Sequence, residues 1–167
     1  MNNFSFMARF NAWANERLYG VVADLSDADY REDRKAFFGS IHNTLNHLLV
    51  GDRLWLARIE GIEHEIRSLD QILHDDFEEL WEARRAEDER FTTLVDSFAE
   101  ARLSTPVTFR RMAGDGAEMS LRLDRILLTL INHQTHHRGQ VHAMLTAGGV
   151  TPLQMDVIDF MGETGTE

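Results

Sequence analysis

Apolar side chains recur at three- and four-residue steps through four long stretches of this sequence, the spacing that places them on one face of an α-helix. The stretches cover about residues 3–24, 41–60, 75–102 and 123–147. Each helix must bury its apolar stripe against a neighbour, and four long amphipathic helices do so by packing as a bundle. The sequence therefore predicts an all-α fold, a four-helix bundle.

Helix boundaries are marked by residues that typically begin or end helices. Ser40 is a suitable N-cap for the second helix, and Gly61 ends it. Glycines at 148–149, with Pro152 beyond them, end the fourth long helix. A short last helix is expected near residues 154–162.

The connections between these helices differ in character. Residues 26–37 are polar and lack a sustained period, which predicts a plain connection. Short stretches at 107–109 and 119–121 flank the turn-forming Ala-Gly-Asp-Gly at 113–116, a pattern that favours a short β-hairpin. We therefore expect a bundle with a long crossover and a hairpin-like insertion before the last long helix. No repeat or break in composition divides the chain, so residues 1–167 are predicted to form a single domain.

Composition excludes several functional classes. The chain has no cysteine, so disulfides, thiolate metal sites and a cysteine nucleophile are impossible. A net charge of −11 without clustered lysine and arginine disfavours nucleic-acid binding. No stretch approaches the roughly 20 apolar residues of a membrane span, and no signal-peptide pattern opens the sequence. We expect a cytoplasmic protein that binds neither nucleic acid nor membrane.

Three of the eight histidines cluster in the last long helix. His133 and His137 are four residues apart, so both imidazoles lie on one helix face and can reach one metal ion. That face is the apolar one, where unpaired polar rings would be costly. His136 is offset by about 60° and His142 is nearly opposite, so we expect them at the surface or as supporting residues. The other reading of His133 and His137 is a pair of buried neutral rings satisfied by hydrogen bonds.

A third ligand must come from elsewhere, and the second helix offers two candidates. His42 and His47 both lie in it. Helical phase does not decide between them, because apolar residues cover most of the circumference of this helix. Periodicity favours His47 only slightly.

Several segments taken together resemble the DinB family of four-helix-bundle metalloproteins. The resemblance covers nearly the whole chain, and its most specific part is the final H-x-x-x-H-R-G-Q. It rests on Phe-Asn-Ala-Trp-Ala-Asn-Glu-Arg-Leu in the first helix, Asn46–Trp55 in the second and Asn132–Gln140 in the fourth. In that family one histidine of the second helix and both histidines of H-x-x-x-H bind a divalent metal, water fills the remaining positions, and two chains usually form a homodimer.

The resemblance implies that His47, His133 and His137 are the metal ligands of this chain. Zinc and nickel are the expected ions, although imidazole also accepts other first-row metals. Three imidazoles leave an open coordination position, as in catalytic sites. The resemblance thus implies a small-molecule substrate and either transfer or isomerisation with a low-molecular-weight thiol, slightly favoured, or metal-dependent hydrolysis. The alternative is a stress-related metal-binding or interaction protein without turnover.

A different bundle chemistry is a carboxylate-bridged di-iron site, for which His74 and Glu78 supply one H-x-x-x-E pair. The paired Glu-x-x-His motifs of such proteins are missing, which disfavours a di-iron site.

Two further residues stand out. Gly139 in a helix interior indicates close approach of another helix, ahead of room for a substrate. Asp52 lies on an apolar face and needs a partner, for which Arg138 is our candidate in a structural ion pair.

Two tryptophans and one methionine are candidates either for the wall of a substrate cleft or for the core. Trp13, Trp55 and Met119 are predicted to belong to the core rather than to such a wall.

Overall fold

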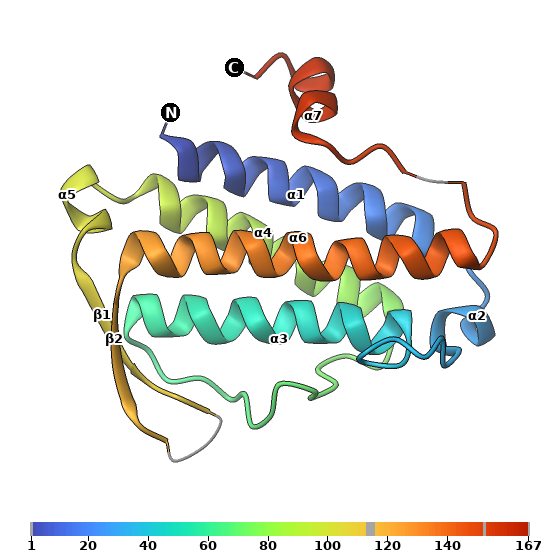
Figure 1. Ribbon diagram of the computed structural model, residues 1–167, viewed down its shortest axis with the longest axis horizontal. Helices are drawn as coiled ribbons and strands as arrows, with labels where there is room; N and C mark the ends of the chain where they lie inside the picture. Colours follow the sequence, from blue (N-terminus) through green and yellow to red (C-terminus); the bar gives the residue numbers. More distant parts are fainter. Residues whose placement is uncertain (1, 113–115, 152, 167) are drawn as a thin grey trace.

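The computed structural model describes residues 2–112, 116–151 and 153–166. Its four long helices are α1 (Asn3–Val22), α3 (Ile41–Glu60), α4 (Phe77–Asp96) and α6 (Leu123–Ala147). They surround a shared interior, and α1 packs chiefly on α4 while α3 packs chiefly on α6 (Figure 1). The predicted all-α four-helix bundle is confirmed. No helix in the described ranges is long and apolar enough to cross a membrane.

Local capping explains where the helices begin and end. The Ser40 side chain accepts a hydrogen bond from the Asn43 backbone N–H, and Gly61 ends α3 in the left-handed conformation with φ of 69°. Asp76 caps α4 in the same way as Ser40 caps α3. At the end of α6 the chain turns at Gly148, as predicted, whereas Pro152 lies outside the described residues.

Two predicted segments require correction. The connection at 26–37 contains a short helix, α2 (Asp27–Arg31), which begins because the Ser26 hydroxyl accepts from the Asp29 N–H. The third helix does not continue to residue 102. It ends at Asp96, and α5 (Glu100–Leu103) follows as a separate turn. Ser97 is the C-cap of α4: its N–H donates to the Thr93 and Leu94 carbonyls, and its hydroxyl donates to the Leu94 carbonyl.

The predicted hairpin is present at one end of the bundle (Figure 1). Strands β1 (Pro106–Arg110) and β2 (Glu118–Arg122) pair antiparallel, with Val107 opposite Leu121. Of the predicted turn at 113–116, residues 113–115 lie outside the described residues. The strands run beside the C-terminal half of α3 and lead directly into α6.

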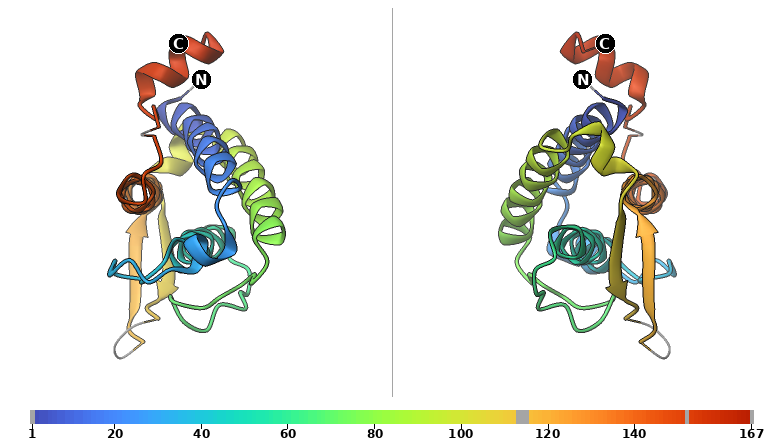
Figure 2. Two further views of the ribbon diagram at one scale, coloured as in Figure 1. Left: turned by 90° about the vertical axis from the view of Figure 1, so that its right-hand side faces the viewer. Right: turned by 90° about the vertical axis from the view of Figure 1, so that its left-hand side faces the viewer.

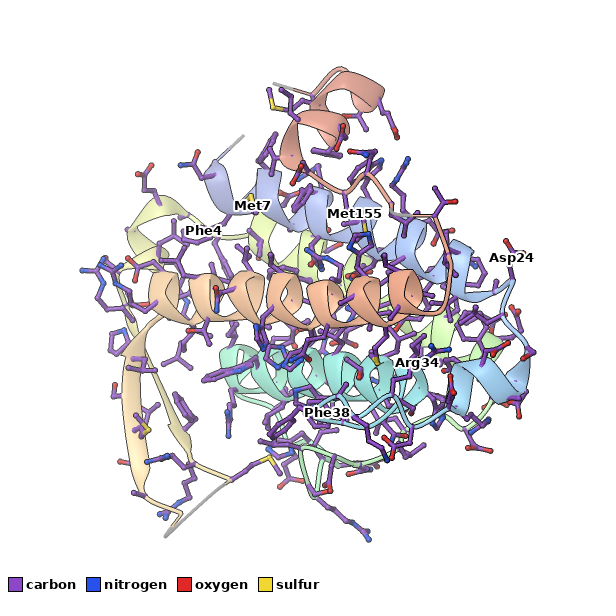
Figure 3. The ribbon with its side chains drawn as sticks, turned by 45° about the vertical axis from the view of Figure 1, so that its right-hand side comes forward. Phe4, Met7, Asp24, Arg34, Phe38 and Met155 are labelled. Carbon is purple, nitrogen blue, oxygen red and sulfur yellow. The ribbon has the colours of Figure 1, made fainter. Side chains whose placement is uncertain are left out.

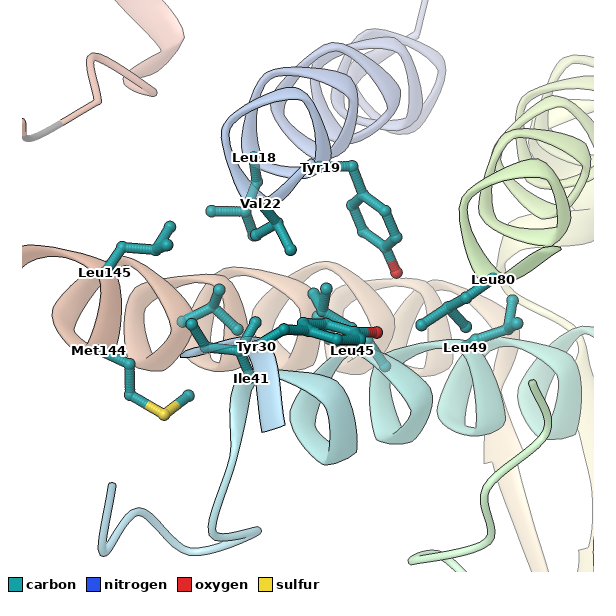
Figure 4. Close-up of a cluster of buried hydrophobic side chains, with 12 residues drawn as sticks. Leu18, Tyr19, Val22, Tyr30, Ile41, Leu45, Leu49, Leu80, Met144 and Leu145 are labelled. Carbon is teal, nitrogen blue, oxygen red and sulfur yellow. The ribbon is translucent and has the colours of Figure 1, made fainter. Parts of the chain in front are cut away.

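Two apolar clusters fill the bundle, one toward each end. Figure 4 shows the first, in which Tyr19 and Leu45 meet side chains of α1, α3, α4 and α6. The second contains Leu56, Phe91 and Ile126 and is covered by the hairpin. The last helix, α7 (Val157–Thr164), stands outside the bundle (Figure 2), and its Phe160 packs on side chains of α1.

Candidate metal centre

Three histidines from two neighbouring helices meet between α3 and α6. His47 lies in the N-terminal half of α3, and His133 and His137 lie one turn apart on α6. Their ring centroids are 4.5–4.9 Å apart, and the Nε2 atoms of His47 and His133 are separated by 2.9 Å. One nitrogen from each ring falls within 4.8 Å of the others. The three rings predicted as ligands are therefore close enough to share one ion, and their role as ligands stays a prediction.

Gly51 makes this convergence possible. It lies one turn after His47 on α3, and a Cβ atom at this position would be 2.7 Å from Cε1 of His133. Any other residue would push the His133 ring away, so the close approach of α3 and α6 depends on this glycine. The close approach predicted at Gly139 is wrong. Gly139 is exposed, with nothing described within 4 Å of its Cβ position.

Hydrogen bonds from outside the cluster orient two of the rings. Nδ1 of His47 is 2.7 Å from the Leu69 carbonyl oxygen, which accepts a hydrogen bond and so requires Nδ1–H. Nδ1 of His137 is likewise 2.7 Å from Oε1 of Gln140, whose amide nitrogen is 3.2 Å from His136 Nε2. In neutral rings these protons leave the Nε2 atoms as acceptors. Two lone pairs therefore remain for the interior of the cluster.

The third ring is held by packing rather than by such a bond. Nδ1 of His133 is buried and has no hydrogen-bond partner among the described residues. Nε2 of His133 points at the Nε2 of His47, which already presents a lone pair. With its proton on Nε2, His133 donates to His47; with its proton on Nδ1, it presents a second lone pair that a cation between the two nitrogens would satisfy. The donor set therefore fits a metal ion.

All three imidazoles favour their neutral form. Burial, and after it the neighbouring His137 and His47, lower the pKa of His133 to about 3. Burial also lowers the pKa values of His47 and His137, partly opposed by their bonds to Leu69 and Gln140. Neutral imidazole is the form that binds metals, so the cluster is ready for a cation at pH 7.

Acid should destabilise the metal-free protein through these rings. Because the pKa of His133 is lower in the folded chain than in the unfolded chain, the unfolded state takes up its proton first as the pH falls below about 6.5. Stability is thus fully present above that pH and is lost on acidification toward pH 3. We expect a loss on the order of 1 to 2 kcal/mol between pH 7 and pH 5.

Urea unfolding at several pH values, with a chelator present, measures this effect. In His133→Gln the side chain does not titrate, so the free energy of unfolding should fall less steeply with acid. Equal slopes for the two proteins would contradict the assignment of the lowered pKa to His133.

An aromatic side chain covers one side of the cluster. The Phe38 ring stacks on His47 with centroids 3.9 Å apart and planes at 25°, and its edge faces His137 at 5.6 Å. Phe38 belongs to the segment before α3 and lies alongside that helix (Figure 3). Such a cover keeps water from that side of the rings and fixes their orientation.

The remaining histidines lie outside the cluster. His42, the other candidate on α3, contacts Asn43 and Arg31 one turn before His47. His136 is exposed and contacts Gln140, while His142 accepts the Leu153 N–H. His74 lies near Glu79, and no carboxylate joins the three-histidine group, so the described residues do not favour the di-iron alternative.

A buried polar network lies directly behind the histidines. Asp52, next to Gly51, forms an ion pair of 2.8 Å with Arg84 of α4, and Arg84 also contacts Asp88 at 3.0 Å. The predicted pair of Asp52 with Arg138 is wrong. Arg138 instead donates to Asn11 and Asn15 of α1, and Gln134 bridges it to Asp52.

The charges of this network depend on one another. Burial raises the pKa of Asp52 to about 6, against the opposing effect of Arg84, and burial lowers the pKa of Arg138 to about 10. Gln134 and Arg138 each follow a cluster histidine in the sequence. The network therefore ties the histidine-bearing turns of α6 to the other three long helices.

Fold and site together define a four-helix bundle whose interior gathers three histidines from two helices, an arrangement compatible with metal binding. The chain belongs to the DinB family, whose family model matches residues 1–167.

Two known proteins illustrate the relationship. Protein DinB of Bacillus subtilis (strain 168) is 25% identical over 175 residues, an alignment that covers 100% of this chain and 99% of that protein. The crystal structure of a DinB-like protein from Bacillus cereus ATCC 10987 superposes with a TM-score of 0.65 at 20% identity, covering 87% of this chain and 91% of the other. The second likeness concerns the fold alone.

Proposed function

We propose that this chain binds one divalent metal ion, zinc or nickel, through His47, His133 and His137 and acts as a metal-dependent enzyme. We favour transfer or isomerisation with a low-molecular-weight thiol over hydrolysis. One observation carries the proposal. Three neutral imidazoles converge, and the hydrogen bonds of two of them to Leu69 and Gln140 leave lone pairs directed into the cluster.

The spacing of the nitrogens supports a shared ion. Two nitrogens bound to one tetrahedral zinc at about 2.1 Å are about 3.4 Å apart, and the separation of 2.9 Å between His47 and His133 is within a small ring movement of that value. Structural zinc sites use four protein ligands, whereas catalytic sites keep a position open. A set of three histidines matches a catalytic site, because it leaves one coordination position open.

A bound ion of this type lowers the pKa of a coordinated water or thiol toward 7. Leu69 and Gln140 hold two rings in the required tautomer, and Phe38 limits the access of water from one side. Because the chain contains no cysteine, no protein thiolate competes for the ion. A thiolate at this site must come from a small molecule, so the absence of cysteine is no obstacle to the thiol-dependent reaction.

The proposal also covers the oligomeric state, the location and the kind of substrate of the protein. We propose a homodimer in the cytoplasm that acts on a small molecule, as the family resemblance implies. Sedimentation equilibrium of the purified chain measures the oligomeric state, and a single species of monomer mass would contradict the homodimer.

Activity screening tests the enzyme proposal. The full-length, tag-free protein loaded with zinc or nickel should react low-molecular-weight thiols with electrophiles, and this turnover should fall on the order of a hundredfold or more in His137→Ala. His136→Ala, which changes the adjacent exposed histidine, should keep most of the activity. Ester or amide cleavage without thiol would favour the hydrolase instead. Metal binding without turnover on either panel would support the non-catalytic alternative and contradict the enzyme proposal.

A further inference from the structure

A cavity of about 450 Å³ lies between the C-terminal half of α3 and the β-hairpin. This volume suits a small organic molecule. Its wall includes Leu69, whose carbonyl oxygen accepts from His47, so the cavity adjoins the histidine cluster. Other lining residues are Trp55, Arg58, Phe109, Met112 and Met119. Trp55 and Met119, predicted as core, therefore form part of a cavity wall.

The three tryptophans of the chain provide an internal comparison, because each has an arginine over its ring. The Arg17 guanidinium lies 4.9 Å from the Trp13 ring, and the Arg85 guanidinium lies 4.0 Å from the Trp81 ring. In both pairs a glutamate joins the two partners. Glu163 accepts from Arg17 and from the Trp13 indole N–H.

The second pair repeats this arrangement. Glu16 accepts from Arg85 at 2.5 Å and from the Trp81 indole N–H at 3.1 Å. One carboxylate thus satisfies an indole donor and a guanidinium at once in each of two separate places. The indole N–H and the guanidinium of each pair lie side by side, and both donate hydrogen bonds. One carboxylate can therefore accept from both.

The third pair lacks this carboxylate. Arg58 lies 4.7 Å from the Trp55 ring and 4.6 Å from the Phe109 ring, and one of its nitrogens donates to the Arg110 carbonyl. Within the described part of the chain, no carboxylate forms an ion pair with Arg58, whose pKa is affected by burial alone, and no acceptor is found for the Trp55 indole N–H. Both side chains line the cavity instead.

Arg58 is also a partly buried cation. Burial lowers its pKa, and the Trp55 and Phe109 rings, whose centroids are 5.0 Å apart, exclude water from one side of the guanidinium. A desolvated guanidinium is stabilised by an anion that it can bind in a bidentate manner. Arg111, which also lines the cavity, adds a second positive charge in a protein of net charge −11.

We propose that this cavity binds a small molecule with an apolar, preferably aromatic, body and one carboxylate group. The carboxylate accepts from the Arg58 guanidinium and the Trp55 indole N–H, as Glu163 and Glu16 do in the other two pairs. The apolar body packs against Phe109 and the thioethers of Met112 and Met119. The assignment of this molecule as the electrophilic co-substrate, rather than the thiol, rests on the proposed function, whereas the binding itself does not.

Calorimetry on the full-length protein, treated with a chelator to remove metal, tests the binding with two matched probes. 2-Naphthoate carries the carboxylate, and 2-naphthamide is its neutral isostere. We expect 2-naphthoate to bind about tenfold or more tightly than the amide, because a charge-assisted hydrogen bond is lost in the amide. Equal affinities, or no binding of 2-naphthoate, would overturn the proposal.

Single substitutions test whether Arg58 and Trp55 cause the preference for 2-naphthoate over 2-naphthamide. Arg58→Gln should lose most of the preference for 2-naphthoate, and Trp55→Phe, which keeps a ring but removes the N–H, should lose part of it. Arg85→Gln is the matched control, since Arg85 covers a tryptophan but already has Glu16, and the preference should remain. A preference that survives Arg58→Gln would overturn the proposal. Because metal is absent, a failed metal proposal leaves these results unaffected.

Discussion

Replacing His133 with alanine is expected to lower the affinity for zinc on the order of a hundred to a thousandfold. Structural zinc sites bind with about 10 to 16 kcal/mol shared among four ligands, so one imidazole contributes about 2.5 to 4 kcal/mol. Burial of its ring atoms and the two neighbouring imidazoles lower the pKa of His133 to about 3, which keeps the ring neutral throughout the usual pH range. Competition with a chromophoric chelator measures the affinity, and elemental analysis of tag-free protein measures the metal content.

His136→Ala is the matched control for this prediction. His136 lies in the same stretch of α6, is exposed, and contacts the Gln140 amide and the His137 ring. Its removal leaves all three converging rings in place, so the affinity should change by no more than a few-fold. If His136→Ala lost as much zinc as His133→Ala, the metal would be held elsewhere on α6.

Helix ends were predictable because the interactions that set them are local. Ser40 and Gly61 act within one turn of their own helix, and both ends of α3 lie where the sequence indicates. The break after Asp96 was missed for a physical reason. Phe98 still packs in the second apolar cluster, so the apolar stripe continues although the backbone has left the helix.

The candidate site was predictable only in part. Periodicity placed His133 and His137 on one inward face, but it left His42 and His47 open, and the family resemblance favoured His47. The contacts of Phe38 and Leu69 come from irregular segments, whose positions depend on the whole fold. Gly51 has no local signal that distinguishes it from Gly139, because the demand for a glycine comes from the opposite helix.

The partner of Asp52 was missed because Arg84 lies in a strongly charged stretch. Residues 82–90 read Glu-Ala-Arg-Arg-Ala-Glu-Asp-Glu-Arg, a composition that usually indicates an exposed helix face. Arg84 is nevertheless only 1% exposed, while the adjacent Arg85 is exposed. The two neighbours in sequence thus occupy opposite environments.

Because Arg84 is buried, replacing it with methionine is expected to lower the free energy of unfolding by about 3 to 5 kcal/mol. The substitution leaves Asp52 and Asp88 buried without their cation, and an uncompensated buried charge is strongly destabilising. For a chain of this length the loss corresponds to a fall in Tm of about 6 to 20 °C. Thermal and urea unfolding measure the change.

Arg85→Met provides the comparison, because its ion pair with Glu16 is about half exposed on both sides and should contribute less than about 1 kcal/mol. The triple variant Arg84→Met, Asp52→Asn, Asp88→Asn removes the stranded charges and should recover part of the loss, since the cost lies in the unpaired carboxylates rather than in missing packing. Equal losses in Arg84→Met and Arg85→Met would contradict this account. Because Asp52 adjoins Gly51 and Gln134 adjoins His133, Arg84→Met should also loosen the contact between α3 and α6 on which the convergence of the three rings depends.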